Sequence, residues 1–209
     1  MIDHVKRCLA ILTTFAALAL LAGCATSKLV SQKANPDYVG KKSFKTVMVV
    51  AVTADEMVRR PFEDRMVAHL AKRGVKGIPG YAAVAKRGKV EEAELKEAIA
   101  RSGADGVLIT RITGMDRSSV NLAESTVAVG YGWGSFYGYY SGVWTTVSTP
   151  AQTVSGPTWT VSETRLFDAK SGTLAWTGIM DSKETNKLDA ALTQYIEVVF
   201  DAMVGDRVL

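Results

Sequence analysis

A nearly unbroken apolar run, Thr46-Val-Met-Val-Val-Ala-Val52, most constrains the fold of this chain. Most of its residues are β-branched, which favours a strand, and it lacks the polar alternation of a strand with one wet face. A strand of this kind has to be covered on both faces. The run therefore predicts an α/β protein in which helices pack on a sheet.

Strands and helices are predicted to alternate through the first half of the chain. One helix is expected to begin at Pro61 and to stop at Gly74, and a second to cover Glu91–Ser102. Further strands are predicted at 75–78 and 107–112. The order strand, helix, strand, helix, strand is typical of two crossover units that feed one sheet.

Antiparallel strands and a final helix are predicted for the second half. Strand-like patterns cover 120–129 and 159–167, and the turn Asp168-Ala-Lys-Ser-Gly172 leads into a returning strand over 173–180. An amphipathic helix from about Lys187 to Val204 follows. The predicted architecture is an α/β sandwich with a mixed β-sheet and three helices.

The N-terminus carries the features of a bacterial secretion signal. Two basic residues precede an apolar run from Cys8 to Leu20 that is short for a permanent membrane span. The run ends on Leu21-Ala-Gly-Cys24, which resembles a lipobox, where lipid is attached to the cysteine thiol and cleavage follows. Residues 1–23 are therefore predicted to be a lipoprotein signal peptide, with Cys24 as the lipidation site. An ordinary signal peptide with an incidental cysteine is the alternative.

The residues after Cys24 lead to expectations about location. Ala25 stands where many Gram-negative lipoproteins retained at the inner membrane have aspartate. For such a source we expect an outer-membrane anchor, with palmitate or a similar acyl group on Cys24 and a domain that faces the periplasm. Residues 24–43 are polar and are predicted to be a lipid-anchored flexible tether. Residues 44–209 are then the periplasmic α/β domain.

Two segments of the domain resemble known envelope proteins. Leu166-Phe-Asp-Ala-Lys-Ser-Gly-Thr-Leu-Ala-Trp176 is similar to the ending of a widespread group of bacterial envelope lipoproteins. Gly103-Ala-Asp-Gly-Val-Leu-Ile109 resembles a motif, Gly-Ala-Asp followed by an apolar strand, that the curli-secretion-channel, TolB N-terminal and penicillin-binding-protein-activator lipoproteins share. The resemblance covers about Phe44 to the C-terminus. It implies a shared fold, and no functional residue is carried over from it.

The sequence predicts no enzyme, cofactor or metal site. His69 is the one histidine that follows the signal, whereas a zinc site needs three or four matched ligands. A Gly-x-Ser-x-Gly nucleophile turn is absent, and the glycines of Gly130-Tyr-Gly-Trp-Gly134 lack the context of a phosphate loop. The net charge of +4 is too mild to argue for nucleic acid.

The stretch Ala128–Trp144 concentrates seven aromatic residues and five glycines, within a Gly/aromatic-rich insert at about 128–157. The favoured interpretation is a surface loop for a partner, because glycines make order costly. A hairpin in an oligomeric pore is the second, since 127–137 has the length and alternation of a barrel strand. In the third, the stretch is an extended sheet edge whose aromatics pack on the protein's own core. The first interpretation makes these residues partner-binding candidates: Tyr131, Trp133, Tyr137, Tyr139, Tyr140 and Trp144.

These features together predict a non-enzymatic outer-membrane lipoprotein that acts as an envelope assembly or interaction module. A subunit of an oligomeric outer-membrane secretion channel and a regulator of cell-wall synthesis are the alternatives. The expected partners are membrane lipid, through acylated Cys24, and an envelope protein or a cell-wall component. The sequence leaves the oligomeric state open.

Overall fold

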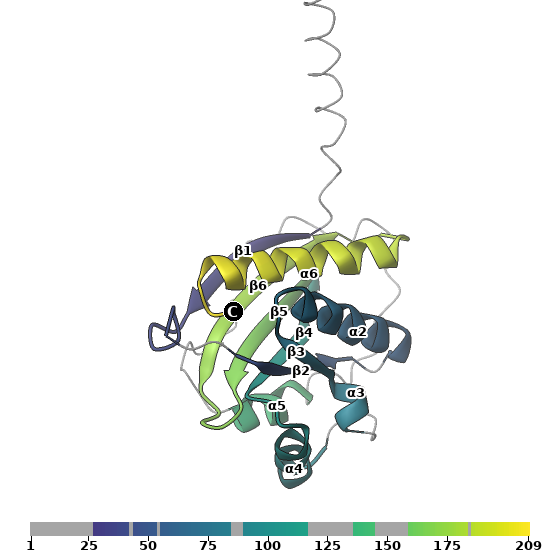
Figure 1. Ribbon diagram of the computed structural model, residues 1–209. Coiled ribbons are helices and arrows are strands. Elements are labelled where there is room, and N and C mark those ends of the chain that lie inside the picture. Colours follow the sequence, from purple (N-terminus) through teal and green to yellow (C-terminus); the bar gives the residue numbers. More distant parts are fainter. Residues whose placement is uncertain are drawn as a thin grey trace, which may run out of the picture.

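A six-stranded mixed sheet forms the centre of the molecule (Figure 1). The computed structural model describes residues 27–41, 44–53, 55–84, 90–116, 136–144, 159–183 and 185–209. The spatial order of the strands is β1-β6-β5-β4-β2-β3. Strands β2, β3 and β4 are parallel, and β1, β6, β5 and β4 pair with antiparallel neighbours. The strands are β1 Ser27–Ala34, β2 Thr46–Val52, β3 Lys76–Pro79, β4 Gly106–Asp116, β5 Trp159–Asp168 and β6 Leu174–Lys183.

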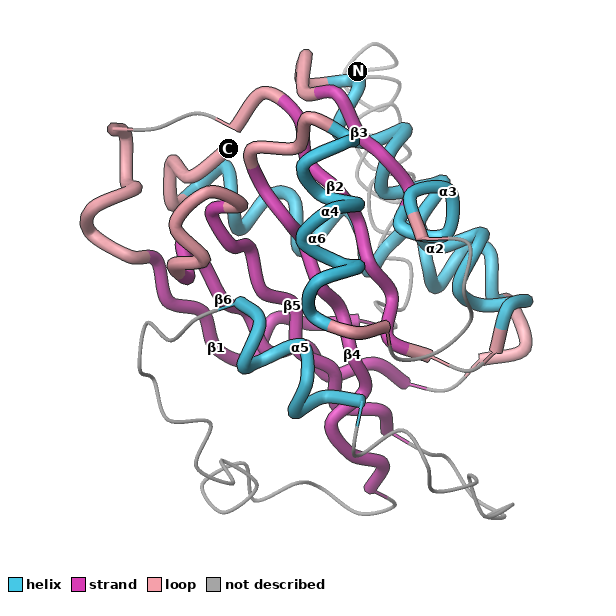
Figure 2. Tube along the Cα trace, turned by 90° about the horizontal axis from the view of Figure 1, so that it is seen from below, coloured by secondary structure: helices cyan, strands magenta, loops and turns pink. Residues whose placement is uncertain are grey.

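Helices cover both faces of the sheet, as the apolar run of β2 predicts. The described helices are α2 Glu56–Lys72, α3 Gly80–Ala83, α4 Glu92–Ser102, α5 Phe136–Trp144 and α6 Leu188–Gly205. Figure 1 shows α2 and α6 above the sheet and α4 and α5 below it, and Figure 2 shows the latter two from below, in front of the strands. Val47, Val49 and Ala51 point toward α2 and α6, whereas Met48 and Val50 lie in the core on the side of α4 and α5.

The predicted α/β sandwich with a mixed sheet is therefore confirmed, with α3 and α5 added to the three predicted helices. The turn between β5 and β6 is also where the sequence indicates it. The Asp168 carboxylate accepts hydrogen bonds from the backbone N–H groups of Lys170 and Ser171, at 2.9 and 3.0 Å. Gly172 has a φ of 70°, a backbone conformation that glycine adopts without strain.

Helix α2 begins five residues before the predicted start at Pro61. The side chain of Asp55 caps it by accepting a hydrogen bond from the backbone N–H of Met57 at 2.8 Å. Arg59 then pairs with Glu56 at 3.2 Å. The local cap and this ion pair start the helix early, so the prediction that proline opens it is wrong.

The predicted tether is wrong over its described residues, because Ser27–Ala34 forms strand β1 at the edge of the sheet. Asn35 continues the attachment, with its backbone N–H on the carbonyl of Ala175 at 2.8 Å. The buried ring of Tyr38 then stacks on Phe44, with the ring centroids 6.2 Å apart. Edge strands carry polar and charged side chains that discourage further pairing, which explains why this strand has a polar sequence.

Part of the Gly/aromatic-rich insert is helical. Phe136–Trp144 forms α5, so the extended conformation is wrong at 136–137, the described end of the barrel strand expected over 127–137. It is also wrong for all of 136–144 under the interpretation of an extended sheet edge. The backbone N–H of Phe136 bonds to the carbonyl of Gly172, at 2.8 Å, and its ring is buried against Phe167. The strand predicted at 120–129 lies outside the described residues.

Candidate functional site

The described part of the molecule contains an apolar cavity of about 260 Å³ at one end of the sheet. We call it the strand-end pocket. Two helices and four strands supply most of its wall: the N-terminal halves of α2 and α6, the ends of β2 and β6, the middle of β4 and the start of β5. Its apolar lining includes Ala51, Val58, Phe62, Ile112, Leu188 and Leu192.

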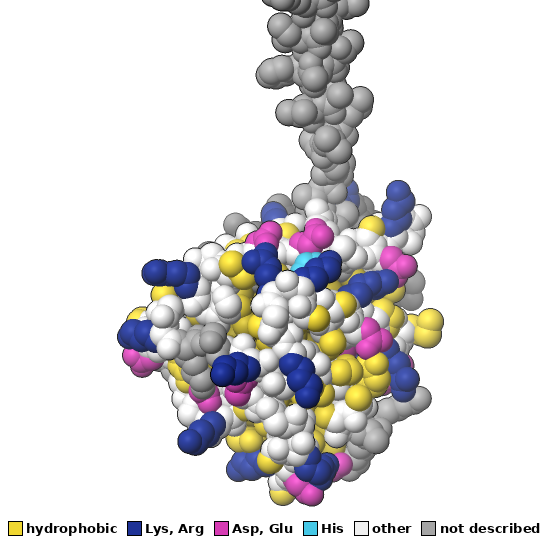
Figure 3. All heavy atoms as spheres, viewed as in Figure 1, with side chains coloured by type: hydrophobic (Ala, Val, Ile, Leu, Met, Phe, Trp, Pro, Cys, Tyr) yellow, Lys and Arg dark blue, Asp and Glu magenta, His cyan; other side chains and the backbone are white. Residues whose placement is uncertain are grey.

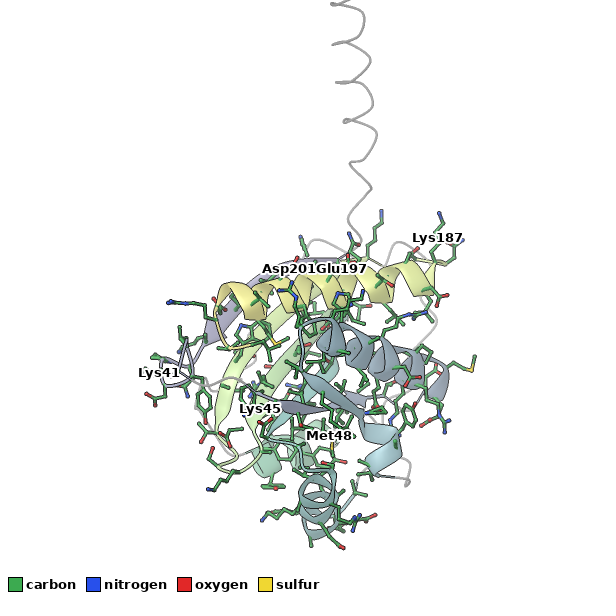
Figure 4. The ribbon with its side chains drawn as sticks, in the orientation of Figure 1. Lys41, Lys45, Met48, Lys187, Glu197 and Asp201 are labelled. Carbon is green, nitrogen blue, oxygen red and sulfur yellow. The ribbon has the colours of Figure 1, made fainter. Side chains whose placement is uncertain are left out.

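The chain topology places this pocket where two helices begin. Helix α2 starts four residues after β2 ends at Val52, and α6 starts five residues after β6 ends at Lys183. Strands β2 and β6 run in the same direction, because β2 is parallel to β4 and β5 is antiparallel to both β4 and β6. Their C-terminal ends therefore lie at the same end of the sheet, where the two helices also start. Figure 4 shows Lys187 at the pocket end of α6, and Glu197 and Asp201 further along the exposed surface of that helix.

Polar groups beside the pocket satisfy one another. The Tyr195 hydroxyl, which is buried, lies 3.1 Å from the Ser162 hydroxyl and 2.9 Å from the Thr164 hydroxyl. Thr164 in turn lies 2.8 Å from the hydroxyl of Thr110. Burial raises the pKa of Tyr195, so this phenol stays neutral. Because these hydroxyls bond among themselves, the pocket offers a ligand a surface that is mainly apolar.

The large apolar side chains that are exposed in the described residues belong to this same end. Ile112 is 50% exposed and Leu188 is 42% exposed, and both line the pocket. Met57, which is 78% exposed, immediately precedes the lining residue Val58. Exposed apolar residues that gather in one place are typical of a surface that contacts lipid or another protein.

Strand β1 begins at the edge of the pocket. Ser27 is buried and lines it. Its backbone N–H bonds to the side-chain oxygen of Gln194 at 3.2 Å, and its hydroxyl lies 2.9 Å from that of Ser182. These bonds attach the start of the described chain to α6 and β6, both of which contribute to the pocket. Three residues span at most about 11 Å, so the predicted lipidation site, Cys24, lies within that distance of Ser27.

The structure gives three of the predicted partner-binding residues roles within the domain itself. Tyr140 is 4% exposed, and its hydroxyl accepts a long hydrogen bond from the backbone N–H of Val90 at 3.4 Å. The prediction that Tyr140 binds a partner at the surface is therefore wrong, because its side chain belongs to the core. The partly buried ring of Tyr137 lies 4.5 Å from the ammonium group of Lys96. Tyr139 joins the charged cluster described next.

Tyr131 and Trp133 lie outside the described residues. Trp144 ends α5, and its side chain also lies outside the described part. Partner binding through these three residues therefore stays a prediction.

A buried charged cluster beneath α5 was not foreseen from the sequence. Glu163 and Arg165 are both buried and pair at 2.6 Å, and Arg111 lies 3.0 Å from the same carboxylate. The Tyr139 hydroxyl donates to Glu163 at 2.8 Å, and the Arg165 guanidinium lies 4.2 Å from the Tyr139 ring centroid. Burial raises the pKa of Tyr139. Inward charges at alternate positions of β5 are the signal that could have indicated this cluster.

Catalytic and metal-binding features are scarce in what the structure describes. The ring centroid of His69 on α2 lies 5.3 Å from that of Phe200 on α6, so this histidine contributes to the packing between the two helices. Within the described residues, no group of three or more His, Cys, Asp or Glu side chains could hold a metal ion. None of the helices in those same ranges is long and apolar enough to cross a membrane.

Charge does not mark out a second site on the face that Figure 3 shows. Lysines and arginines are spread over this face and alternate with acidic and apolar groups. Arg73, from a basic segment after α2, has its guanidinium 3.8 Å from the Asp201 carboxylate. The strand-end pocket, which is apolar and bordered by exposed apolar side chains, is the candidate binding site.

Comparisons with known proteins show only distant similarities. No protein-family model and no curated protein matches the sequence. The PelC dodecamer from Paraburkholderia phytofirmans matches with 12% identity and a TM-score of 0.43, over 88% of this chain and 99% of that one. Lipoprotein GNA1162 from Neisseria meningitidis matches with 14% identity and a TM-score of 0.38, over 77% of this chain and 98% of that one. Similarities at this level assign neither a function nor an oligomeric state to this chain.

Proposed function

We propose that this protein is a bacterial outer-membrane lipoprotein whose periplasmic domain acts as a non-enzymatic envelope assembly or interaction module. Cys24 is the acylated anchor in this proposal, and its partners are membrane lipid and an envelope protein or cell-wall component. The lipobox-like Leu21-Ala-Gly-Cys24 supports the anchor. Two or more acyl chains hold a protein on a bilayer far more firmly than one.

The position of Ser27 is the observation that carries the proposal. Because β1 starts three residues after Cys24, the anchor leads directly into the folded domain rather than into a long tether. The adjoining end of the domain exposes Met57, Ile112 and Leu188. An anchored domain would thus hold its apolar end close to the bilayer, and its remaining surface would face the periplasm and its partners.

Replacement of the predicted anchor tests this proposal. In a Gram-negative host supplied with labelled palmitate, Cys24→Ser should lose the label, keep its signal segment and leave the outer-membrane fraction. Cys8→Ser is the matched control, because Cys8 lies within the segment that is removed, and it should behave as the wild type does. Labelling and normal processing of Cys24→Ser would show that the lipobox interpretation is wrong.

A further inference from the structure

We propose that the strand-end pocket holds part of one acyl chain of the lipid attached to Cys24. This inference rests on the proposed lipidation and extends it, because it assigns the anchor a binding site on its own domain. The anchor is then more than a link to the bilayer. Its acyl chain becomes part of the packing between α2, α6 and the sheet.

The size and lining of the pocket suit a length of hydrocarbon. An apolar cavity of about 150 Å³ in another protein binds benzene, which has six carbons. By that ratio, the cavity of about 260 Å³ accommodates roughly ten carbons of an alkyl chain. Apolar side chains such as Val58, Phe62 and Leu192 line it, and the hydroxyl groups of Ser162 and Thr164 are already bonded to Tyr195. A water molecule in such a space forms few hydrogen bonds, whereas an alkyl segment that enters it removes its apolar surface from the solvent.

The course of the chain favours the protein's own lipid as the occupant. Ser27 lines the pocket and is attached by hydrogen bonds to Gln194 and Ser182. The backbone between it and Cys24 spans at most about 11 Å, so the acyl chain begins near the pocket edge. Covalent attachment at such a short distance gives this chain a high effective concentration, which a free lipid lacks.

The exposed apolar residues at the opening provide a path for the chain. Ile112 and Leu188 line the pocket and remain about half exposed. A hydrocarbon chain that runs over these side chains covers them and stays out of water along its length. Other acyl chains on the same cysteine are free to remain in the bilayer, so occupation of the pocket by one chain does not detach the protein.

A photoreactive fatty acid tests the inference in the full-length protein. Cells that express the chain are supplied with a fatty acid that carries a diazirine near its methyl end, so that the lipid on Cys24 carries the probe. After irradiation, crosslinked peptides are mapped by mass spectrometry. The expected crosslinks fall on the pocket segments of α2 and α6, around Val58–Phe62 and Leu188–Leu192.

Two tryptophan variants on α6 provide a matched pair. Ala191 lines the pocket, so Ala191→Trp fills it and should lose most of the crosslinks to these segments. Ala190 is exposed beside it, so Ala190→Trp should retain them. Equal crosslinking in the two variants would overturn the inference. If Ala191→Trp fails to fold, the crosslink map of the wild type still decides, because a diazirine outside the pocket would label bulk lipid or scattered surface residues.

Failure of this inference can be told apart from failure of the proposed function. An intact mass without acyl groups on Cys24 would contradict the lipidation itself. An acylated chain whose probe labels only bulk lipid would leave the lipidation standing and overturn the pocket assignment. Equal labelling of the pocket in Cys24→Ser would show that a free lipid, and not the anchor, occupies it.

Discussion

At the scale of single residues, Glu63 illustrates how a buried charge can organise a fold. Its carboxylate accepts hydrogen bonds from the backbone N–H groups of Ala51 and Tyr81, at 3.0 and 2.8 Å, and from the Arg59 guanidinium at 3.2 Å. It thereby joins α2 to β2 and α3. Burial raises the pKa of Glu63, while the two backbone donors and Arg59 oppose that rise.

Removal of this carboxylate should destabilise the domain strongly. Glu63→Ala leaves two backbone N–H groups without their carboxylate acceptor and removes one of the two carboxylates that pair with Arg59, so we expect the free energy of unfolding to fall by about 3 kcal/mol. Urea denaturation of the purified chain measures the change. Glu94→Ala on the exposed face of α4 is the control and should stay within about 0.5 kcal/mol of the wild type. A loss of that small size for Glu63→Ala would show that the contacts of this carboxylate contribute little.

At the scale of elements, α5 connects an unusual sequence to the core. Phe136 is 1% exposed and contacts the rings of Tyr137, Tyr140 and Phe167. Gly138 lies on the exposed side of the same helix, where an added methyl group would contact nothing. The aromatics therefore hold the helix on the sheet, whereas the glycines reduce its intrinsic stability. A surface-loop role does not describe this segment.

Substitutions on the two sides of α5 should act in opposite directions. Phe136→Ala should lower the free energy of unfolding by about 3–5 kcal/mol, because it empties a filled site in the core. The double change Gly138→Ala with Gly142→Ala should raise it by about 1 kcal/mol, since neither added methyl group meets another atom. Thermal melting followed by circular dichroism distinguishes these effects. No response to either change would mean that 136–144 does not form this helix.

Strand β1 matters at the same scale, because it completes the sheet. It pairs with β6 from Ser27 to Ala34, and β6 carries the fully buried Trp176 opposite Ala34. The Trp176 indole N–H donates to the Asp206 carboxylate at 2.8 Å. Strand β1 is therefore a structural part of the domain, although its sequence suggests a linker.

Truncation distinguishes a strand from a tether. A chain that starts at residue 44 lacks β1 and leaves one side of β6 unpaired, so it should melt at lower temperature and aggregate more readily than a chain that starts at residue 27. Comparison of the two by calorimetry and size-exclusion chromatography provides the test. Identical melting would restore the tether interpretation.

At the scale of the whole molecule, several features gather at one end of the sheet. The start of β1, the strand-end pocket and the exposed side chains of Ile112 and Leu188 all lie there. The proposed anchor at Cys24 would orient this end of the domain toward the bilayer. The domain would then be held close to the membrane by a few residues, which limits how far it reaches toward a partner.

Much of this molecule can be predicted from local sequence patterns. The double-sided coverage of β2, the turn at Asp168–Gly172 and the amphipathic helix near the C-terminus all follow from hydrophobic period and turn chemistry, which act between residues close in the chain. The lipobox is likewise a local motif.

Other features depend on contacts that only the tertiary structure brings together. Strand β1 is polar because it lies at an edge, and its partner β6 is more than 140 residues away along the chain. Helix α5 forms where Phe136 meets a core supplied by other elements, in spite of its glycines. The strand-end pocket combines Ser27, Ala51, Ile112 and Leu188, and no spacing within one segment relates such residues. Long-range packing, which period and propensity do not encode, decides each of these features.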